Sequence, residues 1–323
     1  MDRLEYRKKL RGNFLPVPTP FHDDFSLDIP TFRRQIRRLL EAGYRTGNGF
    51  LLVGGAAAEF YALETDERKR IAEAAVEEAA GRIPVIVGAQ HSGSLTVLEL
   101  ARFAERIGAD GIQVGPPYYE PPTADDVFEL FQAVSDAADI PIVVYNTWWT
   151  GTNAVMDYDL TARLLEIANI GGLKWSSPSA STYEAVLRDF SPEVAIIDNQ
   201  LCEVYAHMLG ACGFTSHPPL CWPEYGLRFW ACLEEHRYEE ATELLKIMRI
   251  PYYHLFWKAI AYSGCEAHFD KAMMELVGEP VGPPRPPGRP LPASFREEMR
   301  QFLERAGVLK PAMAQNGKAA SRA

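Results

Sequence analysis

Short, continuously apolar runs alternate along the chain with longer segments in which apolar residues recur every three or four positions. The continuous runs, several of them rich in β-branched residues, are typical of strands buried on both faces, whereas the longer spacing is typical of amphipathic helices. The predicted strands span residues 13–18, 49–55, 84–89, 110–117, 141–146, 171–175, 194–199 and 213–218. The predicted helices between them span residues 28–42, 65–80, 95–107, 123–138, 157–168, 182–190 and 201–210.

About eight strand-and-helix units within roughly 200 residues predict a parallel sheet that is covered by helices and closed into a barrel. An open, doubly wound sheet would more often carry a glycine-rich dinucleotide loop, and neither GxGxxG nor GxxxxGK[ST] occurs in the sequence. We therefore predict an α/β fold, a (β/α)8 TIM barrel, over residues 1–220.

After Pro218 the alternation ends, and only helical patterns follow, at residues 223–236, 237–262, 267–276 and 294–306. Residues 280–292 contain so many prolines that they must be extended, either as a docking ligand for another domain or as a linker packed over the barrel. We predict a C-terminal helical extension over residues 221–310 and a disordered tail over residues 311–323.

Composition describes an ordinary soluble protein, because 47% of the residues are hydrophobic and 24% are charged. The net charge of −10 argues against nucleic acid or an anionic membrane as the main partner. No run of about 18 apolar residues predicts a transmembrane helix, and the charged N-terminal stretch lacks the apolar region of a signal peptide. We expect a cytoplasmic protein.

The five cysteines are odd in number and lack the spacing of a zinc knuckle or a CxxC pair. We expect free, mostly buried thiols in a reducing compartment. The cysteines are Cys202, Cys212, Cys221, Cys232 and Cys265.

Two of the predicted strands end on ionisable side chains, Tyr145 after the run 142–144 and Lys174 after the run 170–173. A lysine at the exit of a buried strand is costly unless its pKa falls or a partner holds it. A neutral lysine would be a nucleophile toward a ketone. The alternative is a lysine that extends out of the sheet into a salt bridge.

In a (β/α)8 barrel the active site lies at the C-terminal ends of the strands. One lysine and several tyrosine hydroxyls are expected to converge there on a largely apolar mouth. The carboxylates Asp198 and Glu59, with His217 as a third group, come from distant strands, so we predict no metal site and no cofactor. The polar residues at these strand ends also include Tyr118, Tyr119, Asn146, Asn199 and Ser216.

Four motifs occur in order along the chain: VGGAAAEFYALETDER, GPPYYEPP, PIVVYN and GGLKWSS. With them, residues 12–290 resemble the dihydrodipicolinate synthase / N-acetylneuraminate lyase family of class I, Schiff-base-forming lyases. The resemblance implies that Lys174 condenses with the carbonyl of a 2-oxo acid and that Tyr145 shuttles protons at that carbon. It also implies that the Tyr119 hydroxyl reaches the site of a neighbouring subunit, in a homotetramer or a dimer.

The sequence departs from the family at the loop that usually grips the substrate carboxylate, where this chain has Ala56, Ala57 and Ala58. The alanines remove hydroxyls that would hydrogen-bond a carboxylate, although the backbone N–H groups of residues 57 and 58 are still expected to bind it.

A second departure follows Tyr145, where the synthase branch of the family has an arginine and this chain has Trp148 and Trp149. Together with Trp175 they are expected to surround the lysine, either filling space or lining an aromatic or apolar substrate pocket. Asn199, Ser216 and His217 are further expected substrate contacts. His217 is either an added acid/base group or a structural histidine.

We therefore predict a lyase that forms a Schiff base between Lys174 and a 2-oxo acid and catalyses aldol chemistry or the dehydration of a deoxy-oxo sugar acid. True dihydrodipicolinate synthesis is not expected, because no cation is predicted for the second substrate's carboxylate. The alternative is an altered family member that binds a small molecule or serves as a scaffold. The lost hydroxyls favour that alternative, and the retained Lys174 and Tyr145 argue against it.

Overall fold

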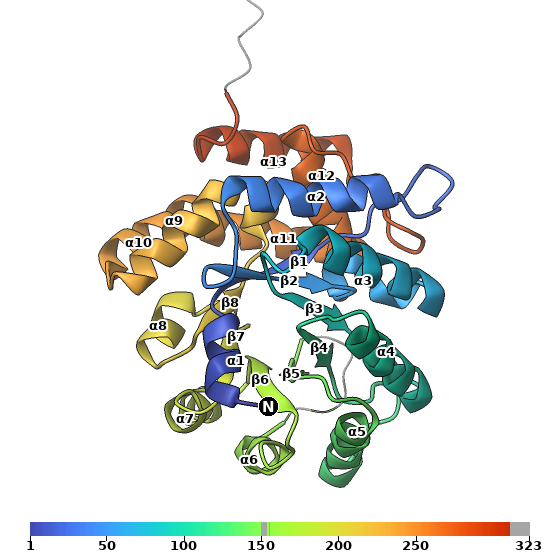
Figure 1. The fold of residues 1–323 in the computed structure, drawn as a ribbon. Helices are drawn as coiled ribbons and strands as arrows, with labels where there is room; N and C mark the ends of the chain where they lie inside the picture. Colours follow the sequence, from blue (N-terminus) through green and yellow to red (C-terminus); the bar gives the residue numbers. More distant parts are fainter. Residues whose placement is uncertain (150–153, 155, 311–323) are drawn as a thin grey trace, which may run out of the picture.

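A computed structural model describes residues 1–149, 154 and 156–310, and in this part of the chain eight parallel strands close into a barrel in sequence order (Figure 1). The predicted (β/α)8 barrel is confirmed. The strands are β1 (Gly12–Val17), β2 (Gly49–Val53), β3 (Val85–Gly88), β4 (Gly111–Val114), β5 (Ile142–Tyr145), β6 (Ile170–Trp175), β7 (Ala195–Asp198) and β8 (Gly213–Thr215).

Helices between the strands form the outer layer of the barrel, and the apolar face of each packs on the sheet (Figure 1). Side chains on the other face of the strands fill the barrel itself, with Phe14 and Phe50 stacked 4.5 Å apart between ring centroids. The outer helices are α2 (Ile29–Ala42), α3 (Thr65–Ala79), α4 (Ser94–Arg106), α5 (Ala124–Ala137), α6 (Tyr158–Leu164), α7 (Ala180–Phe190) and α8 (Glu203–Met208).

Helix α1 (Arg3–Lys9) lies at the N-terminal end of the barrel, and the hydrophobic pattern gave no sign of it. It has a single buried side chain, Tyr6, which joins the apolar cluster inside the barrel. Gly111 and Gly171 leave the space for that ring, because a Cβ at either position would collide with it. One buried residue in seven is too little periodicity to detect in a sequence.

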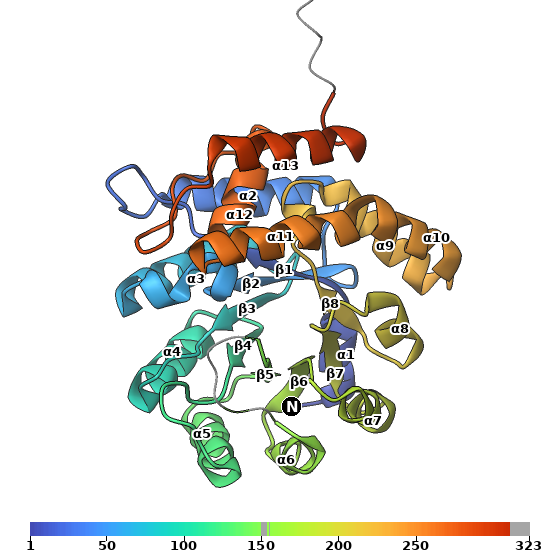
Figure 2. The same cartoon turned by 180° about the vertical axis from the view of Figure 1, so that it is seen from behind.

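The C-terminal helices pack beside the barrel around a second apolar core (Figure 2). They are α9 (Pro223–Glu234), α10 (Tyr238–Leu244), α11 (Ile250–Ser263), α12 (Ala267–Leu276) and α13 (Ala293–Arg305). The expected single helix over 237–262 is instead interrupted by a π-helical turn, Leu245–Arg249, just before Pro251. The turn lies where a proline without an N–H would break the regular hydrogen-bond ladder.

The proline-rich segment 280–292 packs over the barrel, which agrees with its interpretation as a linker rather than as a docking ligand for another domain. Arg285 donates hydrogen bonds to the carbonyls of Phe25 (2.7 Å) and Ala62 (2.7 Å) and forms an ion pair with Glu67. The predicted tail, 311–323, lies outside the described residues. We retain the division near residue 220 as a proposal.

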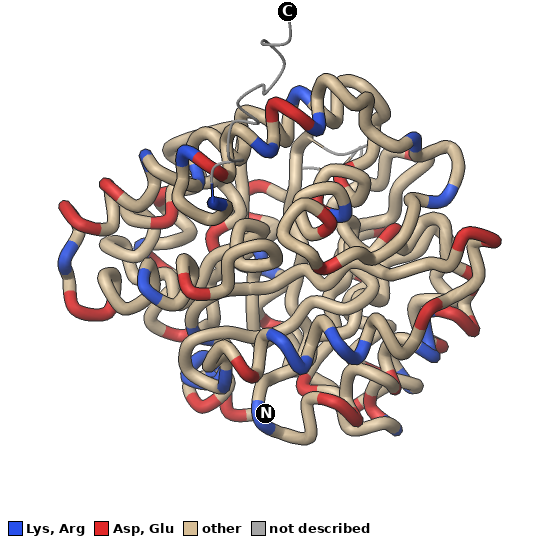
Figure 3. Tube along the Cα trace, turned by 90° about the horizontal axis from the view of Figure 1, so that it is seen from above, with Lys and Arg blue, Asp and Glu red and all other residues tan. Residues whose placement is uncertain are grey.

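Acidic and basic residues are interspersed along the chain around the periphery of the molecule (Figure 3). Within the ranges that the structure describes, no helix is long and apolar enough to cross a membrane. All five cysteines are free, and Cys202 alone is partly exposed.

Candidate active site

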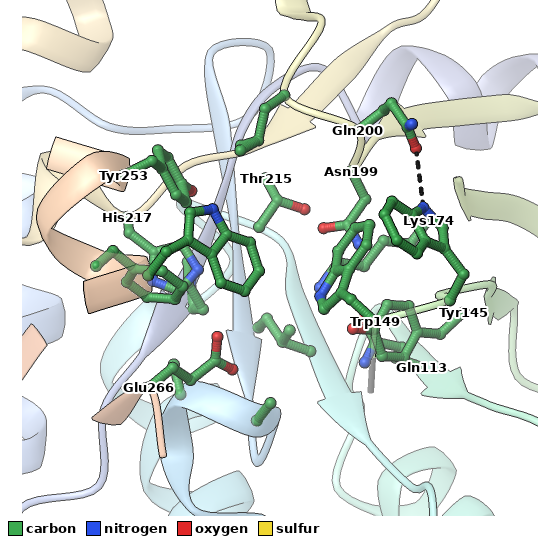
Figure 4. Close-up of a pocket in the computed structure, with 18 residues that line it drawn as sticks. Gln113, Tyr145, Trp149, Lys174, Asn199, Gln200, Thr215, His217, Tyr253 and Glu266 are labelled. Carbon is green, nitrogen blue, oxygen red and sulfur yellow. Dashed lines mark hydrogen bonds between the residues drawn. The ribbon is translucent and has the colours of Figure 1, made fainter. Parts of the chain in front are cut away.

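A cavity of about 440 Å³ lies at the C-terminal ends of the strands (Figure 4). A second cavity of about 400 Å³ adjoins it. The two share Ala56, Tyr145, Trp149, Trp257 and Glu266. Residues from the barrel and from the C-terminal helices line the first cavity together, namely Pro16, Leu52, Ala57, Gln113, Trp148, Lys174, Asn199, Gln200, Leu201, Thr215, His217, Tyr253 and Phe256.

Lys174 lines this cavity from strand β6 and is only 6% exposed. Its Nζ lies 4.4 Å from the centroid of the Tyr145 ring, because strands β5 and β6 place the two residues side by side. Among the described residues no carboxylate forms an ion pair with it, so its side chain does not extend out of the sheet into a salt bridge. Burial lowers the pKa of Lys174 to about 8, and the nearby charge of Glu266 opposes the shift.

Tyr145 also lies against the cavity, and its phenol stays protonated at neutral pH. Burial raises the pKa of Tyr145 above its ordinary value, and the charge of Glu266 adds to the increase. A protonated phenol beside a partly neutral amine can supply a proton when a hydroxyl leaves the adjacent carbon.

The alanine loop forms a short 3-10 turn, Ala56–Ala58, at the edge of the cavity. Ala56 and Ala57 line it, but Ala58 does not: its carbonyl accepts a hydrogen bond from the Thr19 hydroxyl at 2.7 Å. The expectation that the Ala58 N–H binds a carboxylate is wrong, because this N–H donates to the Gly55 carbonyl at 3.1 Å. The described residues accept no hydrogen bond from the Ala57 N–H, which leaves that donor for a ligand.

The tryptophans divide between the cavity and the core. Trp149 packs edge-to-face between Trp148 and Trp257, with ring centroids 5.4 and 6.4 Å away, and the three rings line the cavity. Trp175 does not surround the lysine: it is 1% exposed and packs between the barrel and its helices. Successive residues of a strand point to opposite faces, so the residue after Lys174 must face away from the cavity.

The same alternation corrects the expectation for Ser216. Thr215 and His217 line the cavity, whereas Ser216 lies between them, buried, with its N–H donating to the Phe14 carbonyl at 3.0 Å. Asn199 lines the cavity as expected.

His217 forms a buried hydrogen-bonded chain with residues of the helical extension. Its Nδ1 lies 2.8 Å from an oxygen of Asp270, and the Tyr252 hydroxyl donates to the other oxygen at 2.8 Å. Burial by itself would lower the pKa of His217, but the charge and hydrogen bond of Asp270 outweigh burial and raise it. His217 therefore lines the cavity and is also fixed in place by its hydrogen bond to Asp270.

Helices α11 and α12 contribute a wall of the cavity that the sequence did not predict. Tyr253, Phe256 and Trp257 line the cavity from α11, and Glu266 lines it from the start of α12. None of these four residues follows a predicted strand. The one hint in the sequence was a carboxylate, Glu266, close to an apolar helix.

Tyr119 is 87% exposed and does not line either cavity within one chain, although Tyr118 lines the second one. In residues 1–149, 154 and 156–310, no cluster of three or more histidine, cysteine or carboxylate side chains is placed to hold a metal.

The fold and this cavity define the class of the protein: a (β/α)8-barrel enzyme with its site at the C-terminal ends of the strands. The model of the dihydrodipicolinate synthetase family matches residues 9–306, so the chain belongs to that family, whose members are lyases of the aldolase type.

Individual relatives agree with this assignment. The chain is 30% identical over 302 residues to a 4-hydroxy-tetrahydrodipicolinate synthase from Rhodopseudomonas palustris, covering 93% of this chain and 97% of that one. It is 38% identical over 175 residues to the synthase from Bradyrhizobium diazoefficiens, a match that spans about half of each protein, 54% of this chain and 56% of the relative. A prophage protein of the dihydrodipicolinic acid synthase family from E. coli K12, solved in complex with pyruvate, has the same fold, with a TM-score of 0.82 at 24% identity over 93% of this chain and 99% of that one.

Proposed function

We propose that this protein is a class I lyase that forms a Schiff base between Lys174 and the carbonyl carbon of a small 2-oxo acid. The observation that carries the proposal is the placement of Lys174: buried, with a pKa lowered to about 8, and 4.4 Å from the Tyr145 ring. At pH 7 about a tenth of such an amine is neutral, far more than of an ordinary lysine. The pyruvate bound by the E. coli prophage relative is an example of the substrate class.

Attack of the neutral amine on the carbonyl gives a carbinolamine. Tyr145 donates its proton to the departing hydroxyl, which leaves as water, and a protonated imine and a phenolate remain. The phenolate then removes a proton from C3, and the imine takes up the electrons as an enamine. The Ala57 N–H is a donor that the substrate carboxylate can accept from.

Trapping the imine tests this function. Incubation with pyruvate and borohydride should attach one adduct per chain at Lys174, detected by mass spectrometry of the peptides. Lys174→Ala should lose the adduct, while Lys246→Ala, at an exposed lysine of the helical extension, should keep it. If a panel of 2-oxo acids leaves no adduct, the chain is instead a binding or scaffold member of its family.

We propose that the part of the substrate beyond the imine-forming 2-oxo acid, either an aldehyde acceptor or the group that leaves, carries no charge. Among the described residues that line the two cavities, Lys174 and His217 are the basic ones, and the wall opposite Lys174 carries the carboxyl of Glu266. A second carboxylate in this tryptophan-lined space would lack a guanidinium partner and would meet Glu266, at a cost of several kcal/mol.

We therefore expect kcat/KM for aspartate semialdehyde to fall at least about a hundredfold below that for neutral aldehydes or deoxy-oxo sugar acids. A comparison of these substrates under one set of conditions measures the ratio. A preference for aspartate semialdehyde would mean that a cation from elsewhere reaches the pocket.

A further inference from the structure

Glu266 is a carboxyl group that the proposed steps at Lys174 and Tyr145 do not use. It is the N-cap residue of α12, and its carbonyl accepts hydrogen bonds from the N–H groups of Phe269 and Asp270. Its side chain is partly accessible, and the accessible part lines both cavities. Within the described part of the chain, its carboxyl receives no hydrogen bond that would explain a structural role.

The position of Glu266 is opposite the imine-forming pair. In Figure 4, Glu266 and His217 project from one side of the cavity, and Lys174 and Tyr145 project from the other. Glu266 and Lys174 nevertheless line the same cavity of about 440 Å³, so a ligand that reaches both is a small molecule. A substrate held by Lys174 at C2 whose further carbons cross this cavity would bring them to Glu266.

We propose that Glu266 is the acid that protonates the hydroxyl leaving C4 of a 4-hydroxy-2-oxo acid, which makes the reaction a dehydration. This inference rests on the proposed Schiff base and names the substrate class that it would process. A carboxyl group here, rather than a cation, also suits a neutral hydroxylated chain.

The electrons and protons balance in three steps. After Tyr145 has removed the C3 proton, the enamine electrons form the C3–C4 double bond and break the C4–oxygen bond. Glu266 gives its proton to the departing hydroxyl, which leaves as water, and Glu266 becomes a carboxylate. Water then hydrolyses the unsaturated imine to release a 2-oxo-3-enoic acid, and solvent in the cavity returns a proton to Glu266.

The surroundings of Glu266 keep it available as an acid. Burial raises the pKa of Glu266, the cations of His217 and Lys174 oppose the increase, and Asp270 adds to it. Tyr61, Tyr145 and Tyr253 are the other titratable groups whose pKa values Glu266 affects, and all three phenols are protonated at neutral pH. His217, fixed by Asp270, therefore acts as a positioning residue that tunes Glu266.

The test uses 4-hydroxy-2-oxopentanoate, whose only leaving group on C4 is its hydroxyl. Glu266→Gln should lower the rate at which the unsaturated 2-oxo acid appears, followed by its ultraviolet absorbance, by roughly 10²–10⁴-fold. The same variant should still form the borohydride-trapped pyruvate adduct and exchange the pyruvate methyl protons in D₂O, because these steps use Lys174 and Tyr145. Glu275→Gln, at an exposed glutamate of the same helix, is the matched control and should stay within about twofold of the wild type.

A second variant separates the positioning role of His217 from folding. Elimination should decline as the pH rises through the pKa of Glu266. His217→Gln removes a cation that lowers this pKa, so the alkaline decline should move to higher pH.

Elimination within threefold of wild type in Glu266→Gln would overturn the proposal. So would wild-type enzyme that only cleaves the substrate to pyruvate and acetaldehyde. Loss of the pyruvate adduct in the wild type would instead overturn the Schiff base itself, and the acid role with it.

Discussion

Lys174 occupies a position where protonation costs the folded state free energy. Its pKa is about 8 in the folded protein against 10.5 for an ordinary lysine, and burial is the cause. The folded state therefore binds a proton less readily than the unfolded state does. The penalty is fully present below pH 8 and disappears as the pH rises from 8 to 10.5. Its size is about 3 kcal/mol, which is stability given up at the proposed nucleophile.

Replacing this lysine should thus stabilise the protein while removing its nucleophile. We expect Lys174→Met to increase the free energy of unfolding at pH 7 by about 1–3 kcal/mol, because the buried ammonium is gone and the length of the side chain is kept. Urea unfolding at pH 7 and at pH 10.5 measures the effect, and the gain should vanish at the higher pH. Equal stability of the wild type and Lys174→Met at pH 7 would show that burial of the Lys174 ammonium does not destabilise the folded state.

The rate of imine formation should follow the neutral fraction of the same amine. Below pH 8 the rate constant for trapping pyruvate should rise about tenfold per pH unit, and above pH 8 it should level off. Single-turnover trapping at pH 5.5 to 10.5 gives the profile. A rise that continues to pH 10 would indicate an amine with an ordinary pKa.

Among the elements, the alanine turn depends on helix α12 for its position. Glu59, which follows the turn and has a left-handed backbone (φ 56°), places its Oε1 2.6 Å from the Lys271 Nζ. The other oxygen of Glu59 accepts the Arg285 N–H at 2.8 Å, and Lys271 also donates to the Pro283 carbonyl at 2.9 Å. Both charged side chains are almost completely buried, so each depends on the other.

Removing one partner of this pair should be strongly destabilising. Lys271→Met should lower the free energy of unfolding by about 3–5 kcal/mol, because the Glu59 carboxylate stays buried without its counter-charge. The double variant with Glu59→Gln should recover part of the loss. Lys258→Met breaks an exposed ion pair of the same extension and should cost at most about 1 kcal/mol. A loss no larger than that control would show that Glu59 finds another partner.

At the scale of the whole molecule, the site is proposed to be completed by a neighbouring subunit. Tyr119 does not line either cavity of its own chain and is 87% exposed, in keeping with the role that the family resemblance gives it. We predict a dimer or tetramer, and light scattering at micromolar concentration should return a multiple of the 36.1 kDa chain.

Mixing two impaired variants tests whether Tyr119 acts across the subunit boundary. Co-expressed Lys174→Ala and Tyr119→Ala chains should regain turnover, since some sites would combine Lys174 from one chain with Tyr119 from the other. Each variant alone should be impaired. A monomeric particle, or no recovery in a mixed oligomer, would place the role of Tyr119 elsewhere.

The sequence by itself determined the barrel and the meeting of Lys174 with Tyr145. Continuous apolar strands must be buried on both faces, and Lys174 and Tyr145 each end such a strand, so they had to meet at one end of the sheet. The tertiary structure decided which neighbours face the cavity. Strand alternation directed Trp175 and Ser216 away from it and Thr215 toward it, a choice that depends on register. Glu266 lines the cavity, and Asp270 holds His217, only because α12 packs against the alanine turn and α11, and such long-range contacts leave no local pattern in the chain.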